Sequence, residues 1–96
     1  EAITADASSQ VANITSAVTE VDATSATGAL SLADGAEGQI KTFINVSTSG
    51  TNNVVITPTN LRGGTTITLN AEGETVTCMF KNAKWNVIAG HGFAVA

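Results

Sequence analysis

The chain has 96 residues, a net charge of −4, only 4 Lys and Arg residues, and a single cysteine. So few cations argue against a nucleic-acid partner, one cysteine excludes an internal disulfide, and no apolar run is long enough for a membrane span, so we expect one soluble domain. The apolar fraction of 43% is rich in alanine and only 4% of the residues are aromatic, which predicts a thin core and a need to associate.

Residues 1–28 are rich in Ala, Ser and Thr and contain no aromatic residue, Lys, Arg or Pro. Their β-branched residues favour an extended chain, although the spacing of the apolar positions leaves a helix as the alternative. Because this segment cannot form a core alone, we expect an extended N-terminal arm that docks on a partner. The predicted interface residues of the arm are Ile3, Val11, Ile14, Val18 and Val21.

From Ala29 to Ala96, short apolar runs alternate with stretches that contain Gly, Pro, Asn or Asp. The runs begin near residues 29, 39, 53, 65, 75 and 85, and the stretches between them are typical of turns. Residues 29–96 are therefore predicted to form an all-β domain, a small antiparallel sandwich or barrel of about six short strands.

Side chains alternate between the two faces of a strand, and this assigns a core face to most of the predicted strands. The predicted core residues are Ile40, Ile44, Ile67, Leu69, Val76, Phe80, Trp85 and Val87, with Thr42, Val46 and Cys78 on the same faces. Phe43, Met79 and Ile88 fall on the opposite faces. Apolar residues on a nominally solvated face predict a second buried surface, so these three complete the predicted interface.

The segments LSLADGAEGQIKT and ITLNAEGETVT share an Ala-Glu-Gly stretch between two apolar runs. Two occurrences do not make a repeat array, and we interpret both as reused hairpin turns. Asp34 and Glu37 in the first segment are too few carboxylates for a calcium loop, so an acidic turn without a metal or other cofactor is expected.

Residues with catalytic potential are scarce. His91 lies between two glycines, and Cys78 alternates with Val76 and Phe80 as a small buried hydrophobe would. Neither has a base or an orienting carboxylate at a usable spacing, so we expect no enzymatic activity and rank a small hydrolase last.

Trp85 is the only tryptophan, and the chain has no tyrosine. It follows Phe80 after the polar stretch KNAK and alternates with Val87, which predicts a hairpin whose two strands face one interior. Trp85 is therefore expected to fill a small core, because a sugar-stacking platform would require further exposed aromatic residues.

The segments SLADGAEGQIKTFIN and ITPTNLRGGTTITLNAEGETVTCMFKNAKWNVI carry a resemblance to a known family. They resemble the small β-domains of tailed-bacteriophage virion proteins, especially those of marine and cyanobacterial phages. The likeness spans residues 29–89 and rests on the Asp-Gly turn, the Gly-Gln-x-Lys-Thr strand, the Thr-Pro turn, the GGTTIT strand and the terminal Trp hairpin. Residues 1–28 do not share it, and it brings no catalytic residues.

The resemblance implies a structural protein of the virion, usually a homotrimer. We expect a capsid decoration or cement protein that binds the major capsid protein, or another virion protein, and stabilises the shell. The alternative is a tail-fibre or receptor-binding module that recognises host glycans. The thin core and the apolar residues on both strand faces agree with burial between subunits.

Overall fold

The computed structural model describes all residues, 1–96, and contains ten strands and no helix. The strands are β1 (Ala2–Ala5), β2 (Gln10–Ala12), β3 (Val18–Ala23), β4 (Thr27–Leu32), β5 (Ile40–Asn45), β6 (Asn53–Pro58), β7 (Ile67–Leu69), β8 (Thr75–Lys81), β9 (Lys84–His91) and β10 (Ala94–Val95). The six apolar runs predicted from Ala29 onward correspond to β4 through β9.

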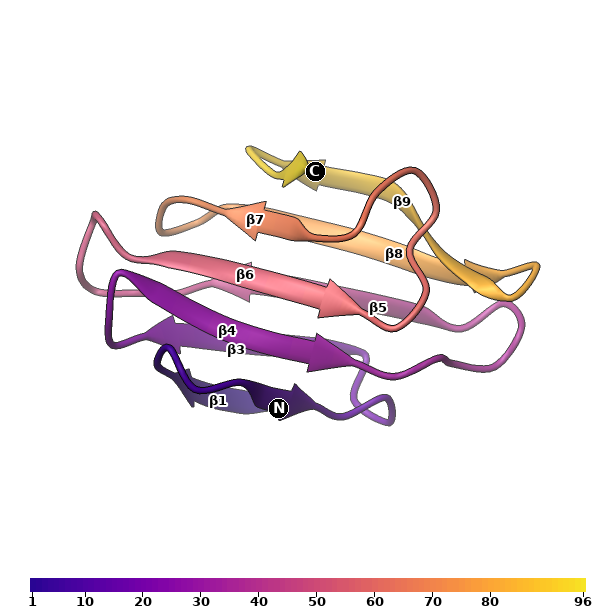
Figure 1. Ribbon diagram of the computed structural model, residues 1–96, viewed down its shortest axis with the longest axis horizontal. Helices are drawn as coiled ribbons and strands as arrows, with labels where there is room; N and C mark the ends of the chain where they lie inside the picture. Colours follow the sequence, from indigo (N-terminus) through magenta and orange to yellow (C-terminus); the bar gives the residue numbers. More distant parts are fainter.

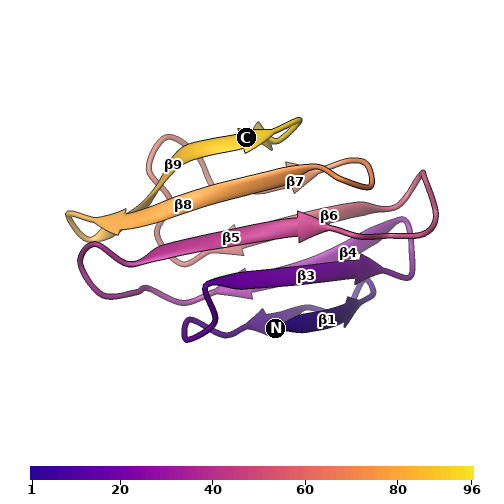
Figure 2. The same ribbon diagram turned by 180° about the vertical axis from the view of Figure 1, so that it is seen from behind.

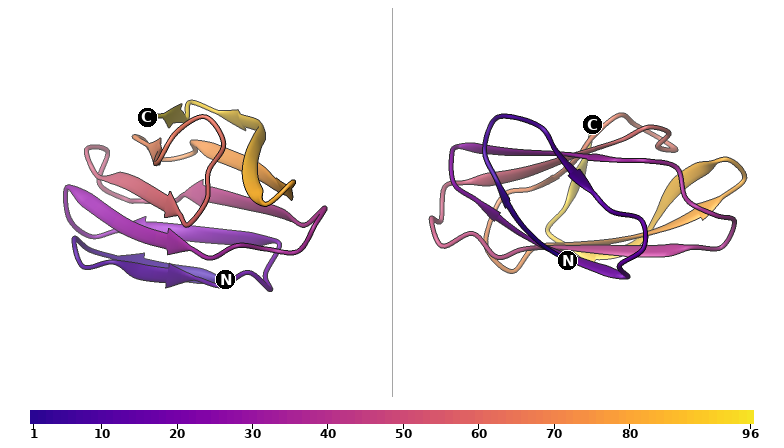
Figure 3. Two further views of the ribbon diagram at one scale, coloured as in Figure 1. Left: turned by 45° about the vertical axis from the view of Figure 1, so that its right-hand side comes forward. Right: turned by 90° about the horizontal axis from the view of Figure 1, so that it is seen from below.

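The strands form two five-stranded sheets that pack face to face (Figures 1 and 2). Sheet A has the order β1-β3-β5-β8-β9, and sheet B has the order β10-β7-β6-β4-β2. The view from below shows the two sheets as separate layers (Figure 3), and the buried apolar side chains form one cluster between them. The predicted all-β sandwich is confirmed.

The first six strands alternate between the sheets, so the chain winds in three coils (Figure 1). Strands β1, β3 and β5 are parallel to one another, as are β2, β4 and β6, because each return passes through the opposite sheet. Every antiparallel pair includes one of the C-terminal strands β7 to β10, including the pairs that join β5 to β8 and β6 to β7. The prediction of an antiparallel sandwich is thus wrong for the first three coils.

The N-terminal segment is not an arm, and the boundary near Gly28 does not separate two units. Residues 1–28 supply β1, β2 and β3 and the start of β4, and β3 lies inside sheet A between β1 and β5. The segment also contributes Ala5, Ala12, Val21 and Ala23 to the core. It lacks large apolar residues because it closes one end of a shared sandwich, where small side chains let the sheets approach.

Strand β5 shows its predicted core face to solvent. Lys41, Phe43 and Asn45 point inward and are fully buried, whereas Ile40 is 49% exposed and Ile44 lies half-buried on the outer face. The prediction fails by one position, which exchanges the two faces of a strand. Phe43 offers the largest apolar side chain to the interior, and polar partners from other strands satisfy Lys41 and Asn45.

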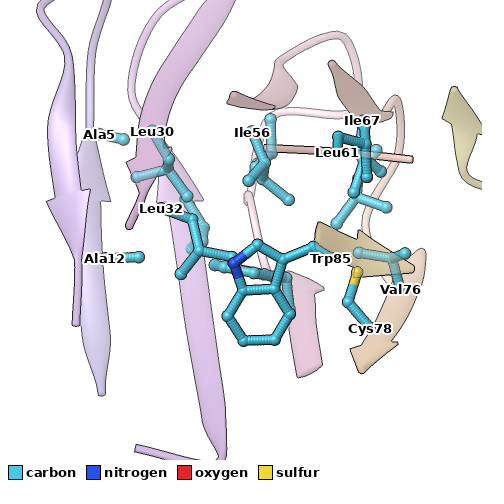
Figure 4. Close-up of a cluster of buried hydrophobic side chains, with 14 of the residues drawn as sticks. Ala5, Ala12, Leu30, Leu32, Ile56, Leu61, Ile67, Val76, Cys78 and Trp85 are labelled. Carbon is cyan, nitrogen blue, oxygen red and sulfur yellow. The ribbon is translucent and has the colours of Figure 1, made fainter. Parts of the chain in front are cut away.

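The C-terminal strands carry the larger core residues, as predicted (Figure 4). Ile67, Leu69, Val76, Phe80 and Trp85 are buried. Val87 is partly buried against the same cluster. The assignment of these strand faces is confirmed.

The two Ala-Glu-Gly stretches form matching turns, but neither joins a hairpin. Gln39 N donates to Ala36 O at 2.9 Å and Glu74 N donates to Ala71 O at 3.1 Å, with Gly38 and Gly73 at φ 84° and 88°. Both turns lie in connections that lead from sheet B to sheet A, β4–β5 and β7–β8. The turn chemistry was predicted, whereas the hairpin interpretation was wrong.

Candidate association surfaces

Trp85 lies at the centre of the core and is fully buried (Figure 4). Its indole N–H donates to the carbonyl of Ala33 at 2.9 Å, and its ring meets Phe80 edge-on at 5.3 Å. Gly35 lies so close that a β-carbon there would approach the Trp85 ring to 2.9 Å. The prediction that Trp85 fills the core is confirmed, and its ring is not accessible to a ligand.

The other residues with chemical potential lie apart from one another. Cys78 is buried in β8, and burial raises the pKa of its thiol to about 11. His91 is exposed at the end of β9. The carboxylate of Asp34 accepts from Asn60, and that of Glu37 accepts from the backbone N–H of Asn82.

No group of three His, Cys, Asp or Glu residues could hold a metal ion, and the surface has no detectable pocket.

A buried lysine, which the sequence did not single out, lies in the interior at one end of sheet A. Lys41 Nζ donates to the carbonyl of Ser16 at 2.8 Å and to Thr19 Oγ1 at 2.5 Å, and it lies 3.8 Å from Glu1 Oε1. It also lies 5.4 Å from the centre of the Phe43 ring. Burial lowers the pKa of Lys41, and the Glu1 carboxylate partly offsets this effect. The network joins all three coils, since Glu1 lies just before β1, Ser16 lies between β2 and β3, Thr19 is on β3 and Lys41 is on β5.

The outer face of sheet A carries a group of apolar side chains, which we call the sheet A face. Val18, Ile40 and Ile88 are 42%, 49% and 52% exposed, and Ile44 and Met79 are half-buried beside them. Ile40 lies next to Met79 in the register. Ile88 is the extra residue of a bulge between the pairs Cys78–Val87 and Thr77–Ala89, and alternation from the buried Trp85 places it on this outer side.

The outer face of sheet B is more polar and provides a comparison within the same molecule. Its central strands β4 and β6 show Thr27, Ala29, Ser31, Asn53, Val55 and Thr57 to the outside. Val11, at the edge of this sheet, is 71% exposed. Solvated sheet faces are normally polar, so the apolar sheet A face is the exception in this molecule.

The structure divides the predicted interface residues into three groups. The prediction is wrong for Val21 and Phe43, because both side chains are fully buried in the chain's own core. Ile3 and Ile14 pack partly against that core. The remaining predicted residues, Val11, Val18, Met79 and Ile88, keep exposed or half-buried side chains. If Phe43 had been assigned to the interior, the alternation of side chains along β5 would have placed Ile40 and Ile44 on the outer face.

Both sheets end at the N-terminal coil in edge strands. The carbonyl of Glu1 accepts from the N–H of Glu20 on β3, and the carbonyl of Ala5 accepts from the N–H of Thr24 just after β3. The backbone groups of the odd-numbered residues of β1 therefore point toward β3. Because backbone groups alternate in direction, the N–H and C=O of Ala2 and Thr4 point away from the sheet. Strand β2 forms the corresponding edge of sheet B.

No protein-family model and no curated protein matches the chain. The structure contains no helix of sufficient length and hydropathy to cross a membrane.

Proposed function

We propose that the chain is a structural protein of a tailed-bacteriophage virion, and that it binds the capsid shell as a decoration or cement protein. The observation that carries the proposal is that β1 and β2, at one end of the sandwich, are edge strands, each with a neighbour on one side only. An open strand edge can accept a strand from another protein through backbone hydrogen bonds. The resemblance of residues 29–89 to phage virion domains supplies the biological context.

The exposed Val11 gives this edge a side chain that a partner can bury. A strand of the major capsid protein, or of another virion protein, would pair with Ala2 and Thr4 on sheet A, and a second segment of that partner would cover Val11 on sheet B. Backbone pairing would supply the affinity, and the apolar contact at Val11 would supply the register.

Burial of the aromatic residues favours shell binding over the glycan-binding alternative. Trp85, Phe80 and Phe43 are all in the core, so no exposed ring of theirs could stack on a sugar. The fourth aromatic residue, Phe93, is partly buried against the same core, so a tail-fibre module that recognises glycans would have to rely mainly on hydrogen bonds.

Location on purified particles tests the proposal. Mass spectrometry should find the chain in virions of the phage that encodes it, and cryo-electron microscopy should place it on the outside of the capsid. Density at the tail tip would favour the receptor-binding alternative, and absence from the particles would overturn the proposal.

A second experiment tests the edge itself. Shells that lack the protein are incubated with the purified chain, and bound protein is measured after sedimentation. Thr4→Pro removes an outward N–H without removing a bond to β3, so it should reduce binding while the melting temperature stays close to that of the wild type. A proline in a central strand, such as Thr57→Pro in β6, would not serve as the control, because it would disturb the sheet itself, as circular dichroism would show. The control is Thr4→Ala, which keeps the backbone N–H and should bind normally.

A further inference from the structure

We propose that the sheet A face is a self-association surface, on which a second copy of the chain docks with two-fold symmetry. The proposal concerns the purified chain and does not depend on attachment to a shell. It replaces the expectation of a homotrimer with a symmetric dimer, for reasons of charge.

The apolar side chains of the surface come from four neighbouring strands, β3, β5, β8 and β9. Val18 on β3 lies beside Thr42 on β5, which lies beside Thr77 on β8, and the Thr42 and Thr77 hydroxyls are 3.0 Å apart. Ile40 and Met79 form the neighbouring row. One of these two hydroxyls donates to the other, so covering the centre of the face leaves only one O–H donor to be satisfied.

Charged residues lie at two diagonally opposite corners of this apolar area. Glu20, on β3, lies beside Ile44 of β5, and Asp22 follows two positions further along the same outer side of β3. Lys81 and Lys84 face each other at the far end of β8 and β9, beyond Met79. At the usual rise per residue, Glu20 and Lys81 are about 20 Å apart along the strands, too far to pair within one copy.

Within the chain, Glu20, Asp22 and Lys84 have no ionic partner, and Lys81 has only an exposed pair with Glu37. Of the four cations, Lys41 is buried and Arg62 is held by Asn86 and by the carbonyl of Asn82. The two ion pairs in the chain use Glu1 and Glu37, so Glu20 and Asp22 have no ionic partner. The pair between Lys81 and Glu37 is exposed and 3.9 Å long, which makes it weak.

A two-fold axis that lies in the plane of the face, passes through its apolar centre and is perpendicular to the diagonal between the charged corners places each acidic corner over the lysine corner of the second copy. An isologous contact repeats every interaction, so the dimer gains both charge contacts at once. A three-fold arrangement would not bring the same face against itself. The charge pattern therefore favours a second copy of the chain over an unrelated partner, and it favours a dimer.

Sedimentation velocity of the full chain, over a range of concentrations, tests the proposal. The wild type should form a dimer that weakens as salt screens the corners. Lys81→Glu with Lys84→Glu should weaken it about tenfold or more, and so should Glu20→Lys with Asp22→Lys, because each leaves only like charges in contact. Mixed in equal amounts, the two double variants should form a heterodimer.

A pair of single substitutions separates the apolar contact from general effects. Ile40→Asp should abolish the dimer, whereas Val11→Asp, at the edge of the opposite sheet, should leave it unchanged. Melting curves establish that each variant is folded. A monomeric wild type at high concentration, a trimer, a dimer that survives Ile40→Asp in a folded protein, or failure of the mixed variants to associate would each overturn the proposal.

Discussion

Lys41 is the residue whose position depends most on the rest of the molecule. Its ammonium group is fully buried. It donates two hydrogen bonds and lies beside one carboxylate, and all three partners are more than twenty positions away in the sequence. A buried charge is costly unless it is paired, and removing one partner is usually worse than removing the charge itself.

Thr19→Val should therefore destabilise the protein by about 1–3 kcal/mol, because it removes the acceptor of Lys41 and also the donor to Glu1. Lys41→Met, which replaces the charge by an apolar chain of similar length, should cost less. The double variant should be more stable than Thr19→Val alone, as measured by urea unfolding. Additive losses in the double variant would show that the two residues do not interact.

Gly35 allows Trp85 to fill the core. A β-carbon at residue 35 would lie 2.9 Å from the indole ring, so Gly35→Ala should cost about 1–3 kcal/mol through overpacking. Gly50→Ala is the matched control, since no atom lies within 4 Å of its added carbon, and its stability should stay near that of the wild type. Equal effects of the two substitutions on urea unfolding would contradict the packing argument.

Cys78 predicts a loss of stability at alkaline pH. Its pKa is about 11 in the folded chain against 9.0 for an exposed thiol, so the unfolded state loses its proton first between these values. The free energy of unfolding should fall over this range by up to about 2.7 kcal/mol relative to Cys78→Ala. Lys41 acts in the opposite direction, because its lowered pKa makes the folded state release a proton first. The difference between wild type and Cys78→Ala, measured at each pH, isolates the thiol.

Among the strands, the β8–β9 hairpin is the element closest to a local prediction. Its turn residues Asn82 and Ala83 have φ of 55° and 65°, which is the turn that favours Asn-Gly in two-residue hairpins. The side-chain amide of Asn86 donates to the carbonyls of Met79, Lys81 and Lys84 and holds the two strands together near the turn.

Ala83→Gly should stabilise the protein by about 1 kcal/mol, because it relieves a left-handed conformation that alanine resists. Ala36→Gly, in an exposed turn with an ordinary φ, should have the opposite sign. Thermal melts of both variants check the prediction, which fails if glycine lowers stability at both positions.

For the sandwich taken together, the three parallel coils make residues 1–28 part of the core. Deleting them removes β1, β2 and β3, exposes the inner edge of β5, and leaves Lys41 without Ser16, Thr19 and Glu1. We expect residues 29–96 alone to be unfolded by circular dichroism. Deleting residues 94–96, which removes only the two-residue edge strand β10, should leave a folded protein. A cooperative melt of the 29–96 fragment would contradict this prediction.

Local chemistry by itself determined the strand positions from β4 to β9, the turns between them and the burial of Trp85. Turn residues and alternating apolar residues act over a few positions, and the faces of β7, β8 and β9 follow from them because each has one clearly apolar side. Strand β5 has apolar residues on both sides, Ile40 and Ile44 on one and Phe43 on the other, so alternation allows two solutions.

Only the tertiary structure decided between those two solutions. The choice depends on whether Lys41 can find partners inside, and these come from other coils, on β3 and before β1. The parallel stacking has the same origin. Glu20 lies beside Ala2 but Thr42 lies beside Val18, so the coils differ in length and leave no fixed repeat in the sequence. Pairing between distant strands depends on backbone groups that every residue has, and it is therefore set by the packing of the whole chain.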